Sequence, residues 1–312
     1  MLCCCSYFLI PLNMTNTQNL ALSYRRYALY ELEHTPKTLK QTQDILAKLT
    51  EFAGTTNIHA LDTRIIREFL HVGREERAWS AKTFRIYRQC LKTYFNWLVE
   101  EEWLDSNPVD KIKQPPLPQR LPRCLGREQV LQLFCHVRDY PWHYELQPYR
   151  NEAMLATLTY TGLRLSELRN LGDRDVDFLS DLIRVDQGKN RKDRYVPICP
   201  ELKPILVRYK KAHKRLGLPS IWFFPSVKSE RRMTAQNIQS VFRKLSKASG
   251  IKVTPQMLRH TFGRLLVESN VHMRTSQKYM GHASIRTTEI YTHVSPEHGQ
   301  KEIRKLKVLS PR

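Results

Sequence analysis

Apolar residues recur every three or four positions over three stretches in the first third of the chain, a spacing typical of amphipathic helices. Thr35 is followed by a proline, which makes it a favourable N-cap, and Gly54 marks the end of the same helix. Asp62 and Ser80 are the predicted caps of a second and a third helix. The third helix carries an apolar stripe formed by Phe84, Tyr87, Leu91, Tyr94, Phe95 and Leu98. Residues 15–110 are therefore predicted to form a helical domain.

The second part of the chain mixes helical and strand patterns. Helices are predicted over residues 127–137, 149–160, 200–216, 234–249, 255–269 and 299–307. Short β-rich runs occupy residues 175–178, 182–185 and 194–197. Gly188 and Asn190 mark a turn between the last two runs. The predicted fold class is mainly helical with a small antiparallel sheet, and residues 125–312 form its α+β domain.

The segment between these two parts is rich in proline and basic residues. Residues 111–124 contain four prolines and four Lys or Arg side chains. This composition does not favour a helix or a strand. We therefore expect an extended basic linker that separates the helical domain from the α+β domain.

The start of the chain and the cysteines bear on where the protein acts. Residues 1–14 are apolar, but the segment is too short to cross a bilayer and lacks the basic start of a signal peptide. We expect a disordered tail, or translation that begins at Met14 rather than Met1, and no membrane partner. The seven cysteines form no pair with metal-binding spacing, which favours a reducing cytoplasm and predicts no bound metal.

The charge of the chain indicates a polyanionic partner. Lys and Arg number 51 against 30 Asp and Glu, a formal net charge of +21. Such an excess is typical of nucleic-acid binding, because each phosphate that is neutralised releases counterions. Opposite the apolar stripe of the third helix lie Arg85, Arg88, Lys92 and Asn96. We predict that this face contacts DNA; the alternative is a solvated basic face.

Two arginines lie where their guanidinium groups could bind a phosphate. Arg164 follows Gly162, which is expected to end an apolar helix, and Ser166 is expected to cap the next one. Gln256 and Arg259 are three residues apart at the start of another helix, so their side chains point the same way. A guanidinium binds a phosphate through two parallel hydrogen bonds. Taken alone, Arg164 also fits a surface arginine beside a helix end.

Two further segments carry groups suited to proton transfer and nucleophilic attack. Lys189 lies in the predicted β-turn beside Arg191 and Lys192, from which it could enter a groove and protonate a leaving oxygen. A plain basic turn is the alternative. His282 precedes Tyr291 by nine positions. A phenol close to a general acid and several cations can attack a phosphodiester and hold a DNA strand covalently.

These four segments, taken in their order along the chain, resemble the motifs of the tyrosine recombinases, also called phage integrases. The likeness covers nearly the whole chain, since the first part resembles the helical core-binding domain of that family, and the Xer recombinases and transposon resolvases are particularly similar. The resemblance implies that Arg164 and Arg259 clamp the scissile phosphate and that Lys189 is the general acid for the departing 5′-hydroxyl. It implies that His282 contacts the same phosphate and that Tyr291 forms a 3′-phosphotyrosyl link.

One position departs from the family pattern. Gln256 stands where the family usually has a histidine, and its amide can donate a hydrogen bond but cannot titrate. We therefore expect contact with the phosphate to persist there and proton transfer to be lost. His260 is interpreted as a hydrogen-bonded core histidine. Tyr291 and not Tyr279 is the predicted nucleophile, because the spacing from His282 selects Tyr291.

The same resemblance implies the partners. The expected substrate is a double-stranded DNA recombination site, bound by a homotetramer during synapsis, with no ATP, metal or other cofactor. The expected task is resolution of cointegrates or dimers, preferably on a mobile element or plasmid, or integration of a mobile element. Two alternatives stay open: a catalytically impaired DNA-binding regulator with the integrase fold, and an enzyme similar to type IB topoisomerases.

Overall fold

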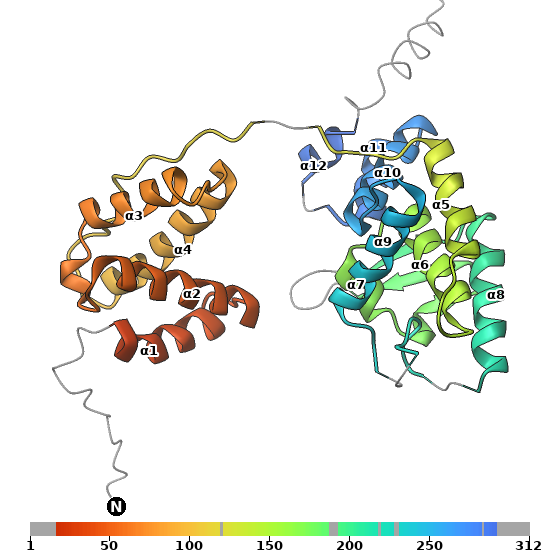
Figure 1. Cartoon of the computed structure of the whole chain (residues 1–312), viewed down its shortest axis with the longest axis horizontal. Coiled ribbons are helices and arrows are strands. Elements are labelled where there is room, and N and C mark those ends of the chain that lie inside the picture. Colours follow the sequence, from red (N-terminus) through yellow and green to blue (C-terminus); the bar gives the residue numbers. More distant parts are fainter. Residues whose placement is uncertain are drawn as a thin grey trace, which may run out of the picture. The chain divides into compact units, whose positions relative to one another are not determined.

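The computed structural model describes residues 17–118, 121–186, 193–217, 220–227, 231–282 and 284–291. The chain separates into two compact units, residues 1–119 and 120–312 (Figure 1). The basic turn with Lys189, Arg191 and Lys192 lies outside the described residues, as does the helix predicted over 299–307. Within the described ranges, no helix combines the length and the apolar character that a membrane span requires.

The first unit is built from helices, as the sequence predicts. Its elements are α1 (Thr17–Tyr30), α2 (Pro36–Ala53), the 3₁₀ turn η1 (Ile58–Ala60), α3 (Thr63–Glu75) and α4 (Ala81–Glu100). Thr35, Asp62 and Ser80 accept hydrogen bonds from backbone N–H groups three residues on, and Gly54 ends α2 with a φ of 63°. These caps are confirmed, because each depends on contacts within a single helical turn. The separate helix α1 was not predicted.

The cationic face of α4 does not lie free in solvent. Arg88 is 7% exposed, and its guanidinium donates hydrogen bonds to the carbonyls of Ile112 (2.6 Å) and Val109 (3.3 Å). Arg88 therefore does not lie on an exposed face as expected, and its contact with DNA stays a prediction. The physical reason is that the chain after α4 folds back and leaves carbonyls that need buried donors.

The two neighbours of Arg88 on this face also bind the returning chain. Lys92 forms an ion pair with Asp110 at 2.5 Å, and Arg85 donates to the side chain of Gln114 at 2.8 Å. Both side chains keep partial exposure. The start of the predicted linker thus packs on the first unit, and Arg85 and Lys92 have protein partners that a phosphate would have to replace or share.

The second unit is organised around one buried helix. Its helices are α5 (Arg127–Asp139), α6 (Gln147–Thr161), α7 (Leu165–Asn170), α8 (Leu202–Arg215), α9 (Ala235–Ser249), α10 (Pro255–Glu268), α11 (Met273–Met280) and α12 (Arg286–Glu289), with a 3₁₀ turn η2 (Asp173–Asp175). Helix α6 packs against α5, α8 and α10, and residues 153–156 and Leu158 have no exposed area. Helices α11 and α12 were not predicted.

A three-stranded antiparallel sheet confirms the predicted strand region. Its strands β1 (Val176–Asp177), β2 (Leu182–Val185) and β3 (Arg194–Pro197) pair in the order β1-β2-β3. Side chains alternate between the two faces of a strand, so Val196 and Arg194 both point inward from β3 while Tyr195 is exposed. Because of this alternation, the guanidinium of Arg194 lies in the interior. It lies beside α11, against which β3 packs.

Candidate functional site

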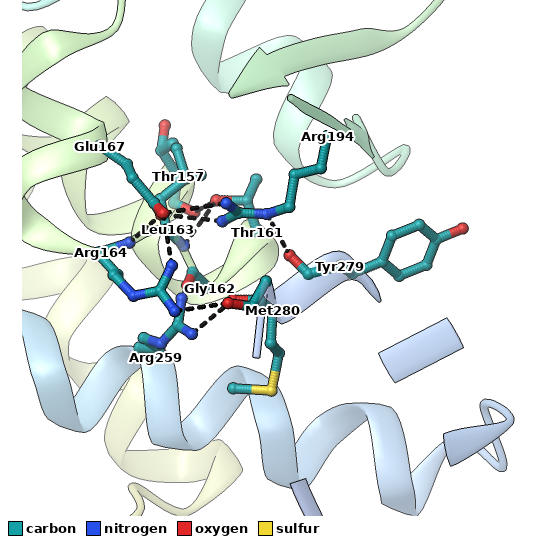
Figure 2. Close-up of polar contacts among 11 residues, drawn as sticks. Thr157, Thr161, Gly162, Leu163, Arg164, Glu167, Arg194, Arg259, Tyr279 and Met280 are labelled. Carbon is teal, nitrogen blue, oxygen red and sulfur yellow. Dashed lines mark hydrogen bonds and ion pairs between the residues drawn. The ribbon is translucent and has the colours of Figure 1, made fainter. Parts of the chain in front are cut away.

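Arg164 is held at the junction of two helices. Gly162 ends α6 in the left-handed region with a φ of 61°, and the chain turns so that Arg164, and not Ser166 as predicted, precedes α7. The guanidinium of Arg164 donates to the Glu167 carboxylate at 2.7 Å (Figure 2). It also donates to the Gly281 carbonyl at 2.6 Å. The backbone N–H of Arg164 donates to the same carboxylate at 2.7 Å. One glutamate therefore fixes both the backbone and the side chain of this arginine.

Arg259 on α10 is more deeply buried, with 8% of its area exposed. It donates hydrogen bonds of 2.5 Å to the carbonyls of Gly162 and Met280, which lie at the C-terminal ends of α6 and α11 (Figure 2). Helix C-termini carry partial negative charge, which suits a cation. Burial, and then the nearby Arg164, lower the pKa of Arg259 to about 10. It remains protonated at neutral pH.

A third arginine, which was not assigned a role from the sequence, completes this cluster. Arg194 of β3 is 4% exposed and binds both oxygens of Glu167, at 3.0 and 2.9 Å, while its Nε donates to the Tyr279 carbonyl at 2.8 Å. Burial raises the pKa of Glu167, but its hydrogen bonds and charge interactions with Arg194 and Arg164 outweigh this and hold the pKa at about 2. Two guanidinium groups thus share one carboxylate, and the guanidinium of Arg259 lies close by, an excess of positive charge suited to a phosphate.

Tyr291 lies in an apolar pocket next to this cluster. Its ring packs with Phe262 and Met280, and only 1% of the residue is exposed. The phenol oxygen lies 2.8 Å from Nδ1 of His260. Burial raises the pKa of Tyr291 to about 12, although the charge of Arg259 acts in the opposite direction. The phenol is therefore protonated at neutral pH.

His282 covers the ring of Tyr291. The two rings are stacked, with centroids 6.4 Å apart and an interplanar angle of 12°, and His282 Nδ1 lies 2.9 Å from the hydroxyl of Thr288. Burial, and then the charges of Arg259 and Arg164, lower the pKa of His282 to about 4. The imidazole is neutral near pH 7 and acts there as a hydrogen-bonding group, not as a cation.

These side chains open onto one groove of about 920 Å³ in the second unit. The predicted site residues that line it are Arg164, Gln256, Arg259, His282 and Tyr291. The structure therefore brings together five residues that lie up to 127 positions apart in the sequence. The sixth, Lys189, lies outside the described residues.

The groove also contains residues that sequence reasoning missed. His260 was interpreted as a core histidine; it is hydrogen-bonded, but its partner is the candidate nucleophile. Gln236, Gln239 and Arg243 of α9 line the same groove. Their spacing of three and four places them on one polar helix face, which was a signal available in the sequence.

A glycine on α10 makes room for the ring of Tyr291. A Cβ atom added to Gly263 would lie 2.6 Å from two ring carbons of Tyr291, closer than packed atoms can approach. The backbone of α10 therefore forms the floor on which the phenol ring rests. Gly263 and His260 are one helical turn apart, so the same helix face holds both the ring and its hydroxyl.

The substitution Gly263→Ala is expected to displace Tyr291 while leaving the helix intact. Overpacking of this kind typically costs about 1–3 kcal/mol, and we expect DNA cleavage to fall at least roughly 100-fold, since a displacement of about 1 Å has that effect on a reacting group. Gly126→Ala is the control, because a Cβ there would meet nothing closer than 3.8 Å. Equal single-turnover cleavage rates for Gly263→Ala and wild type would contradict the proposal that Gly263 leaves space for the Tyr291 ring.

Comparison with known proteins identifies the class to which this fold and site belong. The phage integrase family matches residues 123–298, and the phage integrase SAM-like domain matches residues 21–114. The chain therefore belongs to the phage integrase family. It is a tyrosine recombinase, a class of enzyme that cleaves and rejoins DNA.

Individual relatives extend over most of the chain. A tyrosine recombinase of Thermosipho africanus (strain TCF52B) is 30% identical over 292 residues, which are 90% of this chain and 96% of that protein. Tyrosine recombinase XerC of Escherichia coli O157:H7 is 30% identical over 290 residues, which are 91% of this chain and 95% of that protein.

Solved structures show the same fold at lower identity. The Tn1549 transposon integrase, in complex with transposon right end DNA, has a TM-score of 0.70 and 21% identity, covering 93% of this chain and 99% of that one. The XerH site-specific recombinase bound to palindromic difH substrate has a TM-score of 0.70 and 19% identity, covering 92% of this chain and 83% of that one.

Proposed function

We propose that this chain is a site-specific DNA recombinase in which the phenol oxygen of Tyr291 attacks the scissile phosphate and forms a 3′-phosphotyrosyl link. The observation that carries the proposal is the shared groove, in which Tyr291 lies beside the guanidinium groups of Arg164 and Arg259. Both similar structures above contain DNA. Duplex DNA is accordingly the proposed substrate.

The arginines supply the charge that the reaction needs. Negative charge grows on the phosphoryl oxygens in the transition state, and donors that are already in place stabilise it without reorganisation. Contacts with described residues use two N–H groups of Arg164 and two of Arg259, whereas a guanidinium has five. The remaining N–H groups are available to a phosphate, and losing one such donor typically raises the barrier by about 3 kcal/mol.

The other roles follow the family pattern. Gln256 has an exposed side chain in the groove, so its amide can donate to the phosphate. His282 contacts the phosphate and holds the Tyr291 ring, and Lys189 protonates the departing 5′-hydroxyl. Because the covalent link conserves the energy of the phosphodiester, the reaction needs no ATP.

We also propose how the protein assembles, where it acts and which biological task it performs. Strand exchange joins two duplexes, and we propose a homotetramer at synapsis, acting in the cytoplasm. Residues 15–110 would bind DNA with Arg85 and Lys92, while Arg191, Lys192 and the α9 residues Gln236, Gln239 and Arg243 would contact it from the catalytic domain at 125–312. Resolution of dimers or cointegrates is the preferred task, and integration of a mobile element is the alternative.

A second candidate function is favoured by Gln256. A glutamine cannot titrate, so a chain in which this position was the essential proton carrier would bind recombination sites without cutting them. Such a protein would be a DNA-binding regulator with the integrase fold.

A suicide substrate separates the two functions. The DNA carries a nick close to the scissile phosphate, so that a short fragment diffuses away after cleavage and the covalent intermediate accumulates. The proposed enzyme gives a protein–DNA adduct attached to a 3′ phosphate, detected by denaturing electrophoresis and mapped by mass spectrometry of the linked peptide. Binding to the site without any adduct would support the regulator and exclude the enzyme.

A further inference from the structure

Helix α10 places a titratable group on the phenol of the proposed nucleophile. His260 Nδ1 lies 2.8 Å from the Tyr291 oxygen, which is hydrogen-bond distance. His260 directly follows Arg259, so the helix that holds a phosphate-binding guanidinium also presents an imidazole to the attacking group. Within the described residues, His260 is the side chain hydrogen-bonded to this phenol.

The phenol needs a proton acceptor that the other groove residues do not supply. Its pKa of about 12 leaves very little phenolate at neutral pH. Gln256 cannot accept a proton under these conditions. The neutral His282 stacks on the ring face, and its Nδ1 contacts Thr288 rather than the phenol oxygen.

We propose that His260 is the general base that takes the proton of Tyr291 during cleavage and returns it during rejoining. This inference rests on the proposed function of Tyr291 as nucleophile. It moves the proton transfer from the position occupied by Gln256 to the residue after Arg259, one helical turn further along α10.

The surroundings of His260 favour this role at neutral pH. Burial, and then the charge of Arg259, lower the pKa of His260 below its usual 6.5. The neutral imidazole can therefore accept a hydrogen bond from the phenol through Nδ1, with its own proton on Nε2. The other titratable groups around this pair are Arg164, Arg243, His282 and Cys124.

The same charges couple the proton transfer to DNA binding. In the free protein, an imidazolium beside Arg259 and Arg164 would be unfavourable, so the proton stays on Tyr291. A bound phosphate adds negative charge between these groups and raises the proton affinity of His260. The nucleophile is thus activated only when the scissile phosphate is in the groove.

Cleavage transfers one proton from Tyr291 and exchanges one bond to phosphorus for another. The phenol O–H bond breaks as the Tyr291 oxygen forms its bond to phosphorus, and the proton moves to Nδ1 of His260. The bond between phosphorus and the 5′ oxygen breaks, and that oxygen receives its proton from a separate general acid. In rejoining, the 5′-hydroxyl attacks phosphorus and His260 returns its proton to the tyrosine oxygen.

Single-turnover cleavage of the nicked substrate by His260→Gln tests this assignment across pH 5.5–9. Wild type is expected to rise with pH as His260 loses its proton and then to stay level. The variant is expected to be about 100-fold slower at pH 7. Its deficit should shrink by roughly tenfold per pH unit, because hydroxide then generates the phenolate in place of the imidazole. A pH-independent deficit, or none, would overturn the proposal.

A modified leaving group distinguishes a base from an acid. Replacing the bridging 5′ oxygen of the scissile phosphate by sulfur gives a leaving group that needs no proton. His260→Gln should stay about as impaired on this substrate as on normal DNA, whereas rescue to the wild-type rate would show that His260 serves the leaving group. If the glutamine variant melts below the assay temperature, His260→Ala with added imidazole decides: concentration-dependent recovery supports the base, and no recovery in a folded protein rejects it.

The outcomes also separate this proposal from the one on which it rests. A wild-type adduct at Tyr291 combined with a pH-independent effect of His260→Gln would remove only the general base. A wild-type protein that forms no adduct at Tyr291 would overturn the nucleophile and the base together.

Discussion

Tyr291→Phe is expected to abolish the covalent adduct completely while the protein stays folded. The ring would keep its place between Phe262 and Met280 and under His282, since only the hydroxyl is removed. The lost hydrogen bond to His260 should change the free energy of unfolding by about 1 kcal/mol. DNA binding should stay within a few fold of wild type, because the arginines proposed to bind the phosphate are unaffected. Denaturing electrophoresis of the suicide-substrate reaction measures the effect.

Tyr279→Phe is the matched control. Tyr279 contributes its backbone carbonyl to Arg194, whereas its hydroxyl points away from the arginine cluster (Figure 2). Removing that hydroxyl should leave adduct formation unchanged. An adduct that survives in Tyr291→Phe, or disappears in Tyr279→Phe, would show that the nucleophile has been misassigned.

Glu167→Gln is expected to have the second largest effect, on both stability and cleavage. The Glu167 side chain is 9% exposed and forms ion pairs with Arg164 and Arg194, and Arg194 has 4% of its side chain exposed. Removing one partner of a buried ion pair typically costs about 3–5 kcal/mol, because the other charge stays buried without compensation. We expect a loss of this size in urea unfolding. Cleavage should also fall, since Arg164 loses the contact that orients its guanidinium.

The pH dependence of the free energy of unfolding provides a second measurement of how much the Glu167 carboxylate stabilises the protein. Because the folded state lowers its pKa to about 2, its contribution is fully present above the unfolded pKa of about 4.3 and is lost as the pH falls towards 2. Wild type should therefore lose stability between about pH 4 and pH 2, and the Glu167→Gln curve should be flatter there. Parallel curves for the two proteins would contradict the ion-pair assignment.

Glu152→Gln is the control that should lower the stability of the protein without changing the geometry of the groove. Glu152 is 3% exposed on α6 and pairs with Arg138 at 2.6 Å and with Arg208, but it does not line the groove. This control should also destabilise the protein, and cleavage per folded molecule should stay near that of wild type. Equal losses of cleavage in the two variants would show that Glu167 acts only through general stability.

Helix boundaries were largely predictable because they are local. Thr35, Asp62 and Ser80 cap their helices through N–H groups three residues away, and Gly54 and Gly162 adopt the left-handed conformation that ends a helix. Ser166 was mistaken for a cap because α7 begins at Leu165, one residue before it. The Glu167 carboxylate accepts a hydrogen bond from the backbone N–H of Arg164, the residue that precedes the helix.

The fate of individual charged residues was much less predictable. Arg88 and Arg164 both belong to basic segments, yet Arg88 is buried against backbone carbonyls of the first unit while Arg164 opens onto the groove. In the sequence Arg194 looked like part of a basic hairpin. Its side chain instead lies on the inward face of β3 and binds Glu167 in the interior. The sequence shows the charge of such a side chain, but its partners are far away along the chain.

The amino-acid sequence was enough to predict the chemical groups of this protein: two arginines proposed to bind phosphate, a histidine, a phenol, and a glutamine that cannot titrate. It also determined the helical fold class, because hydrophobic spacing and caps act within one or two turns. The folded chain was needed to show that Glu167 binds both Arg164 and Arg194, and that His260 contacts Tyr291. Those contacts join Arg164 to a carbonyl 117 residues away and His260 to a phenol 31 residues away. Such pairs form only when the burial of the whole core brings distant segments together.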